Sequence, residues 1–192
     1  REGYRTVAVV DHPGINAGRH FDQGFDDYIS LSRKLGWHKW AGSAPEAVFE
    51  EFTAVLERRG HAPTFLYVHL VYPHRPYTPK PPFEGMFGPG FTNPVREEGQ
   101  GVLNSYYAEL RMTDELVGTM HDYMANNCLL DDTGISGDWS CMPPKGATIG
   151  PKEYLGARLR SSWNGFMCGN SQVSWQRFTV RLAITAQPTH GL

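Results

Sequence analysis

The sequence predicts an α/β protein with a mostly parallel sheet flanked by helices. Two apolar runs of strand length, residues 6–10 and 65–71, enclose a segment with helical spacing, residues 43–60. Strand, helix, strand is the order of a βαβ unit. A nearly continuous apolar run is typical of a strand that is buried on both faces of a parallel sheet.

The first predicted strand is short and rich in β-branched residues. Thr6–Val10 lies between Gly3 and the Pro13-Gly14 pair, and both flanks favour turns. The following segment, residues 11–27, is rich in Gly, Asp, His and Pro, which predicts a long loop. We expect this loop to close in a turn over residues 24–28, anchored by aromatic side chains.

The first predicted helix begins at a sequence that resembles a capping box. Ser43 is followed three positions later by Glu46, and Pro45 is tolerated in a first helical turn. Gly60 is a plausible end of the helix. The apolar residues between them recur at helical spacing: Val48, Phe49, Phe52, Val55 and Leu56.

The second predicted strand, residues 65–71, leads into a segment with an unusual composition. Residues 72–83 contain five prolines, and a Gly-rich stretch continues to Gly90, which predicts a long ordered loop. Ligands of parallel α/β sheets bind beyond the carboxyl ends of the strands. His74 lies there between Pro73 and Pro76, with Arg75 beside it. A protonatable side chain in this setting is a candidate anion contact or general acid.

The remaining elements are a long helix and two further strands. Apolar residues at helical spacing predict a helix from about Leu103 to Asn126, and residues 129–133 lead into a third strand. Residues 178–185 alternate between apolar and polar side chains, which predicts another strand.

Composition limits the classes of function. The formal net charge is −2, which argues against a strong electrostatic hold on nucleic acid or anionic membranes. No apolar run approaches the roughly 18–20 residues that cross a bilayer. Three cysteines without metal-type spacing predict neither a disulfide framework nor a cysteine-based metal site.

Charge also divides the chain near residue 133. Residues 134–192 carry six Lys and Arg against two acids, so their formal charge is +4 and residues 1–133 carry −6. This is a boundary in composition. Together with the motifs described below, it predicts one partial α/β domain over residues 1–133 and a divergent tail of uncertain fold over residues 134–192. A shifted reading frame is one hypothesis for the origin of this tail.

Three motifs in residues 1–133 resemble the sulfatase family of the alkaline phosphatase superfamily. Gly3-Tyr4-Arg5-Thr6 with Gly24-Phe25-Asp26 is similar to the family's G-Y-x-T and G-F-D stretch. Residues 65–69 and 73–77 resemble its F-L-Y-V-H strand and P-H-x-P-Y loop. Residues 107–110, with Asp114, Gly118 and residues 129–133, resemble its Y-x-A-E helix and L-x-D-D-T turn. Their order and spacing make the combined signal specific.

The resemblance implies a calcium-dependent hydrolase of sulfate esters on a doubly wound α/β sheet. The fold of this chain is then expected to be part of a doubly wound, mostly parallel sheet flanked by helices, and incomplete. Its substrate would be a small sulfate ester or a sulfated glycan. In this family a C-x-P-x-R or serine motif supplies a formylglycine nucleophile, and the loop histidine contacts the sulfate group. By position that histidine is His74, which is thus the candidate catalytic and substrate-binding residue. A cation-capable donor there would stabilise charge on the departing ester.

Several positions depart from the family pattern. The nucleophile motif is expected upstream of Arg1, so we expect the 192-residue chain itself to be inactive. Residues 10–13, Val-Asp-His-Pro, replace the G-K-W-H segment of many arylsulfatases. Asp138 is the candidate metal ligand where the family has S-D-H-G, although Trp139 stands in place of the histidine. Cys141-Met-Pro-Pro-Lys resembles the nucleophile motif only superficially, because it ends in lysine and follows the other motifs.

Two other functions are compatible with the residues. A phosphoryl-ester hydrolase or transferase of the same superfamily would share the sheet and the metal site. A noncatalytic α/β fragment or binding module would share the framework alone. The identity of the upstream nucleophile, and assays against sulfate and phosphate esters, would discriminate these alternatives.

Overall fold

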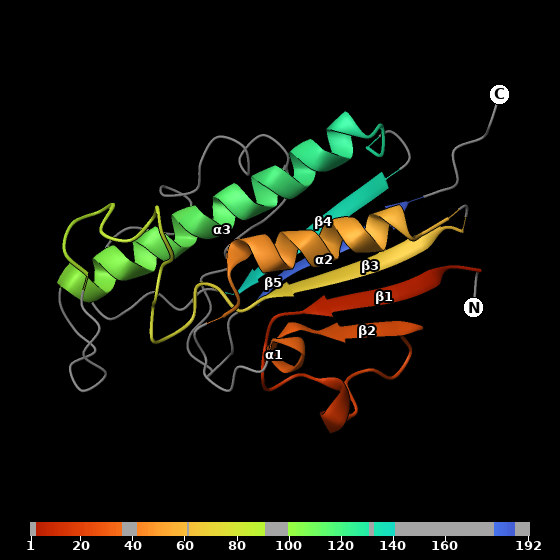
Figure 1. The fold of residues 1–192 in the computed structure, drawn as a ribbon, viewed down its shortest axis with the longest axis horizontal. Coiled ribbons are helices and arrows are strands. Elements are labelled where there is room, and N and C mark those ends of the chain that lie inside the picture. The colour runs from red at the N-terminus through yellow and green to blue at the C-terminus, as the bar shows by residue number, and fades with distance from the viewer. Residues whose placement is uncertain are drawn as a thin grey trace.

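A computed structural model describes residues 3–35, 42–60, 62–90, 100–130, 133–140 and 179–186 of the chain. Figure 1 shows a sheet with helices packed across it. In chain order the elements are β1 (Arg5–Val10), a 3₁₀ turn (Ala17–Arg19), β2 (Asp27–Ser30), α1 (Leu31–Lys34), α2 (Pro45–Glu57), β3 (Thr64–Leu70), α3 (Gln100–Asn126), β4 (Thr133–Ser140) and β5 (Thr179–Ala186).

The sheet has the strand order β2-β1-β3-β5-β4. Strand β1 pairs in parallel with both β2 and β3, so that Val9 lies between Ile29 and Val68. Strand β5 pairs antiparallel with β3 on one side and with β4 on the other. The structure therefore confirms a mixed α/β fold with a three-stranded parallel part that is flanked by helices, small and incomplete.

The hydrophobic core lies between the parallel strands and the helices α2 and α3, which cross the same face of the sheet in Figure 1. Val9 and Val68 of the strands and Phe52 of α2 are fully buried, as the apolar spacing of these segments predicts. From α3, only the C-terminal half joins this core, through Leu116, Val117, Met120 and Met124. Of the helices in the described residues, none combines the length and apolar character needed to cross a membrane.

The N-terminal half of α3 packs instead against the proline-rich loop that follows β3. Tyr77 of the loop lies in one buried cluster with Val102, Tyr106, Tyr107 and Leu110. Farther along, Met112 packs with Val71 and Tyr72 in a second cluster. The backbone N–H of Lys80 also donates to Met112 Sδ at 3.4 Å. One helix therefore supports both the hydrophobic core and the loop that carries His74.

Two local predictions need correction. The loop predicted over residues 11–27 is present but ends one residue early, because β2 begins at Asp27. The predicted turn over residues 24–28 therefore overlaps this edge strand of four residues, which is followed at once by the short α1. The predicted capping box is absent: Ala44 is the N-cap of α2 and makes no side-chain cap. The physical reason is that the Ser43 hydroxyl donates to the buried Asp11 carboxylate instead, at 2.5 Å.

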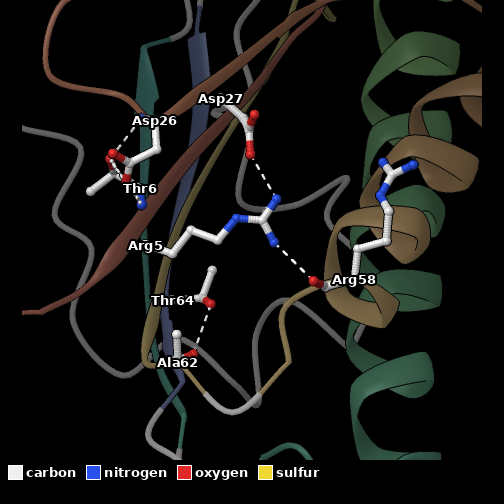
Figure 2. A network of polar contacts seen from close by, with 7 residues as sticks. All are labelled: Arg5, Thr6, Asp26, Asp27, Arg58, Ala62 and Thr64. Atoms are coloured by element: carbon white, nitrogen blue, oxygen red, sulfur yellow. Dashed lines mark hydrogen bonds and ion pairs between the residues drawn. The ribbon is translucent and has the colours of Figure 1, made fainter.

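Polar contacts tie the edge strand β2 to its neighbours at the amino end of the parallel strands (Figure 2). The Arg5 guanidinium donates to Asp27 Oδ2 at 2.6 Å and to the Arg58 carbonyl oxygen at 2.9 Å. Beside it, Asp26 Oδ2 accepts hydrogen bonds from the backbone N–H and hydroxyl of Thr6. These contacts fix β2 against β1 at the end of the sheet opposite to His74.

Candidate functional site

Polar side chains gather at the carboxyl ends of β1 and β3. Asp11 and His12 follow β1 directly, His69 lies near the end of β3, and His74 follows four residues after that strand ends. The backbone N–H of Asp11 donates to the His69 carbonyl oxygen at 2.9 Å, which joins the two strand ends. Because the strands are parallel, both chain segments leave the sheet at the same edge, where ligands of such sheets bind.

Three histidine rings lie next to one another at this edge. The His12 and His69 ring centroids are 5.3 Å apart in an edge-to-face arrangement. The His12 and His74 centroids are 6.2 Å apart, also edge to face. His12 and His69 are buried, whereas His74 is partly exposed. The structure therefore places the predicted site residue His74 beside His12, a residue that the sequence analysis did not select.

Hydrogen bonds assign different roles to the rings of His12 and His74. His12 Nδ1 accepts the Gly14 backbone N–H at 2.9 Å, so its proton in the neutral ring is on Nε2. His74 Nδ1 lies 2.5 Å from the Arg75 carbonyl oxygen, which can only accept, so Nδ1 carries a proton. The titrating nitrogen of His74 is therefore Nε2. In the neutral state His12 offers a donor at Nε2 and His74 an acceptor.

The surroundings of His74 favour its neutral form. Burial lowers the pKa of its imidazole below the usual 6.5, and the positive charge of Arg75 adds to this effect. The hydrogen bond to the Arg75 carbonyl oxygen raises the pKa; its influence is smaller than that of burial but larger than that of the Arg75 charge. An anion bound beside the ring would reverse the balance, because an opposite charge stabilises the imidazolium ion.

Asp11 connects the end of β1 to the start of α2. Its carboxylate accepts the Ser43 backbone N–H at 3.0 and 3.1 Å and the Ser43 hydroxyl at 2.5 Å. The side chain has no exposed surface. Burial raises the pKa of Asp11, while the hydrogen bonds from Ser43 and the charge of Lys80 lower it. This residue holds the backbone that surrounds the histidines.

Glu109 of α3 lies beneath the His74 loop and is completely buried. Its two carboxyl oxygens accept backbone N–H groups of the loop: Oε2 from His74 at 3.1 Å and Oε1 from Thr78 at 2.5 Å. Burial raises the pKa of Glu109 to about 8, against the opposing effect of these hydrogen bonds and of Lys80. A carboxyl group with this pKa is mostly protonated at pH 7, which avoids the cost of burying a charge.

Tyr72 is buried near Asp11 and Glu109. Its ring is 1 % exposed, and its hydroxyl has no hydrogen-bond partner among the described residues. Burial strongly raises its pKa, and the nearby carboxylates of Asp11 and Glu109 raise it further. Tyr72 therefore stays a neutral phenol at physiological pH.

The second predicted site residue, Asp138, lies in β4 and is paired in register with Arg181 of β5. Its side chain is outside the described part of the structure, as are Asp131, Asp132 and the Cys141 motif. Within the described residues, no three His, Cys, Asp or Glu side chains are placed so that they could hold a metal ion.

Sequence reasoning selected His74 but missed Asp11, His12 and Glu109 as members of this site. A signal for His12 exists, because it follows the first parallel strand as His74 follows the second, and such strand ends meet at one edge. Ser43 was assigned to a helix cap because its bond to Asp11 spans 32 residues and leaves no local pattern. Glu109 has no sequence signal of burial, since helical glutamates are usually exposed.

Comparison with known protein families supports the resemblance. The sequence profile of the sulfatase family matches residues 1–136, well over half of the chain. The chain belongs to the sulfatase family, and it is therefore a sulfatase-like hydrolase in its general class. A search of curated proteins and a search of solved structures found no match.

Proposed function

We propose that this chain contributes to the hydrolysis of sulfate esters, with His74 in contact with the sulfate group. The observation that carries the proposal is the place of His74: beyond the carboxyl end of β3 and 6.2 Å from the His12 ring, centroid to centroid. Membership in the sulfatase family supports the same assignment. Substrates would be small sulfate esters or sulfated glycans.

In the proposed reaction His74 acts through Nε2. The neutral ring accepts a proton there as the anionic ester binds, and the imidazolium ion then donates it to the departing ester oxygen. The ring orientation is held by the bond between Nδ1 and the Arg75 carbonyl oxygen. A donor placed where negative charge develops stabilises the transition state. His12, with its proton on Nε2, would supply a second donor to the same anion.

A formylglycine nucleophile and a calcium ion are further parts of the proposal, and both rest on family membership. Asp138 is the residue of this chain that we propose as a calcium ligand. The sequence contains no C-x-P-x-R or S-x-P-x-R segment, so we expect no turnover by the 192-residue chain itself.

Binding of inorganic sulfate, followed by NMR of the histidine rings, tests the role of His74. We expect His74→Ala to weaken sulfate binding by about tenfold, as the loss of a charge-assisted contact of ~1.4 kcal/mol predicts. The exposed His20 is the matched control, and His20→Ala should leave the affinity unchanged. Because the pKa of His74 lies below 6.5, wild-type affinity should rise as the pH falls through that pKa.

Equal affinity in the wild type and His74→Ala would contradict the proposed role. Assays with p-nitrophenyl sulfate and p-nitrophenyl phosphate in the presence of calcium separate the alternatives. Release from the sulfate ester above the His74→Ala level would refute the expected inactivity. Preference for phosphate in both binding and release would favour the phosphoryl-ester alternative. Binding of neither anion would favour a noncatalytic module.

A further inference from the structure

The tip of the His74 loop is exposed, yet the backbone on both sides of it is anchored. Arg75 and Pro76 are exposed to solvent, whereas Tyr77 is only 4 % exposed and packs against Tyr106 of α3. Glu109 accepts hydrogen bonds from the backbone N–H groups of His74 and Thr78, which flank this tip. A five-residue segment of the loop is thus fixed at both ends by one side chain.

Anchoring the backbone at His74 also restricts its ring. The His74 N–H is bound to Glu109 Oε2, while the ring Nδ1 is bound to the carbonyl oxygen of the next residue, Arg75. A rotation of the backbone that broke the first contact would also displace the second. The orientation of Nε2 therefore depends on a carboxyl group that lies on another element.

We propose that Glu109 is the positioning residue of the His74 loop, holding the backbone at His74 and Thr78 so that the His74 ring keeps its orientation. This inference rests on the proposed function of His74. Both hydrogen bonds of the Glu109 carboxyl group come from backbone N–H groups of the loop, so in this proposal Glu109 acts through His74 and not on a substrate. The isosteric Gln retains one acceptor but places an NH₂ group against the other N–H, which opposes a donor to a donor.

The groups that face Glu109 come from several segments. His74 and Lys80 belong to the loop, and Tyr72 lies at its beginning. Asp11, at the end of β1, also interacts with two of these groups: the charge of Lys80 lowers the pKa of Asp11, and the charge of Asp11 raises the pKa of Tyr72. Because several titratable groups lie near Glu109, its titration should be followed at the two amide protons that it binds, which report on this carboxyl group directly.

The test uses the isotope-labelled 192-residue chain and compares wild type with Glu109→Gln. In the wild type, the His74 and Thr78 amide protons should shift with pH along one shared titration curve. In Glu109→Gln this curve should vanish, and the midpoint of the His74 ring should move upward as the loop loosens into solvent. The dissociation constant for inorganic sulfate should rise about tenfold.

Glu115→Gln is the matched control, because Glu115 is a carboxylate on the same helix that is 44 % exposed and pairs with Arg111 at 2.9 Å. This variant should behave as wild type in all three measurements. A Glu109→Gln protein that is less stable but keeps the wild-type His74 titration and sulfate affinity would overturn the proposal, since that result means a structural role alone.

Two further outcomes are separable. If Glu109→Gln does not fold, the amide titrations of the wild type still test the proposal. Different titration curves for the His74 and Thr78 amide protons would then overturn it. If the wild type binds no sulfate, the proposed function fails, while the amide and ring titrations still test whether Glu109 positions His74.

Discussion

At the scale of single residues, Ser43 joins two elements through one hydroxyl. If this hydroxyl is removed, an oxygen of the buried Asp11 carboxylate loses a hydrogen-bond donor. We expect Ser43→Ala to lower the free energy of unfolding by about 1–3 kcal/mol, measured by urea denaturation. Thr53→Ala removes a hydroxyl bonded only within α2 and should change it by about 0.5 kcal/mol or less. Equal losses in both variants would show that the Asp11 contact contributes little.

Glu109 gives a prediction for the pH dependence of stability. Because its pKa rises from 4.5 to about 8 on folding, the folded protein binds more protons than the unfolded chain between these values. The contribution to stability is therefore complete below pH 4.5 and is lost as the pH rises through about 8. Relative to Glu109→Gln, the wild type should lose up to about 1.4 kcal/mol per pH unit. Urea denaturation at several pH values measures this.

The shifted pKa of Asp11 is present in both proteins, so the comparison removes its contribution. The pKa of His74 is expected to rise in Glu109→Gln, so its contribution does not cancel, but the wild-type pKa of His74 lies below 6.5, whereas that of Glu109 is about 8. A difference in stability that stays constant with pH would contradict the prediction. Glu115→Gln keeps Glu109 and should therefore follow the wild-type pH dependence.

The sequence identifies a residue at the sheet edge where neighbouring residues in the chain single it out. His74 stands out because prolines flank it and a buried strand precedes it. The carboxyl group that binds its backbone, Glu109, is 35 residues away, and at the same edge of the sheet Asp11 binds a serine 32 residues away. Contacts of that separation depend on how the elements pack, which no local spacing encodes.

At the scale of elements, the edge strand β2 depends on polar contacts more than on burial, because Ser30 is its only buried residue. Arg5→Lys removes the forked guanidinium that binds both Asp27 and the Arg58 carbonyl oxygen. These side chains are partly exposed, so the loss of stability should be about 1 kcal/mol or less.

The effect of Arg5→Lys should be local. Amide hydrogen exchange in β2 should accelerate, while the fully buried Val68 of β3 keeps its protection. Arg33→Lys changes an exposed arginine of α1 and is the control. Accelerated exchange in β3 as well would mean that Arg5 stabilises the sheet as a whole.

The contrast between elements with buried apolar faces and short elements held by polar contacts also explains which elements could be predicted from the sequence. β1, α2, β3 and α3 carry apolar side chains at strand or helix spacing, and the structure contains all four. β2 and α1 have four residues each, too few for a period to emerge. The pairing of β5 between β3 and β4 was not predicted either, because strand order is a property of the tertiary fold.

At the scale of the whole molecule, β5 connects the tail to the rest of the sheet. Leu182 pairs in register with Val68 of β3 and Gly137 of β4. Proline there removes an N–H from an interior strand, and we expect Leu182→Pro to lower the free energy of unfolding by about 3 kcal/mol or more. Leu182→Ala keeps the N–H and is the control for loss of the side chain.

This experiment also tests the predicted division between residues 1–133 and 134–192, which stays a prediction. The strand pairing favours one shared loss of stability in Leu182→Pro, visible as faster exchange at both Val9 and Val68. Unchanged protection at these two residues would instead support independent segments.

The two packing roles of α3 have a consequence for how such a protein can change. One half of the helix supports the core and the other supports the His74 loop, and the two sets of contacts share no residue. Effects of mutations at separate, non-contacting positions are close to additive. Loop substitutions matched by changes in the first half of α3 can therefore accumulate without repacking the core. Laboratory evolution of ligand preference should concentrate its libraries on that half-helix and the loop above it.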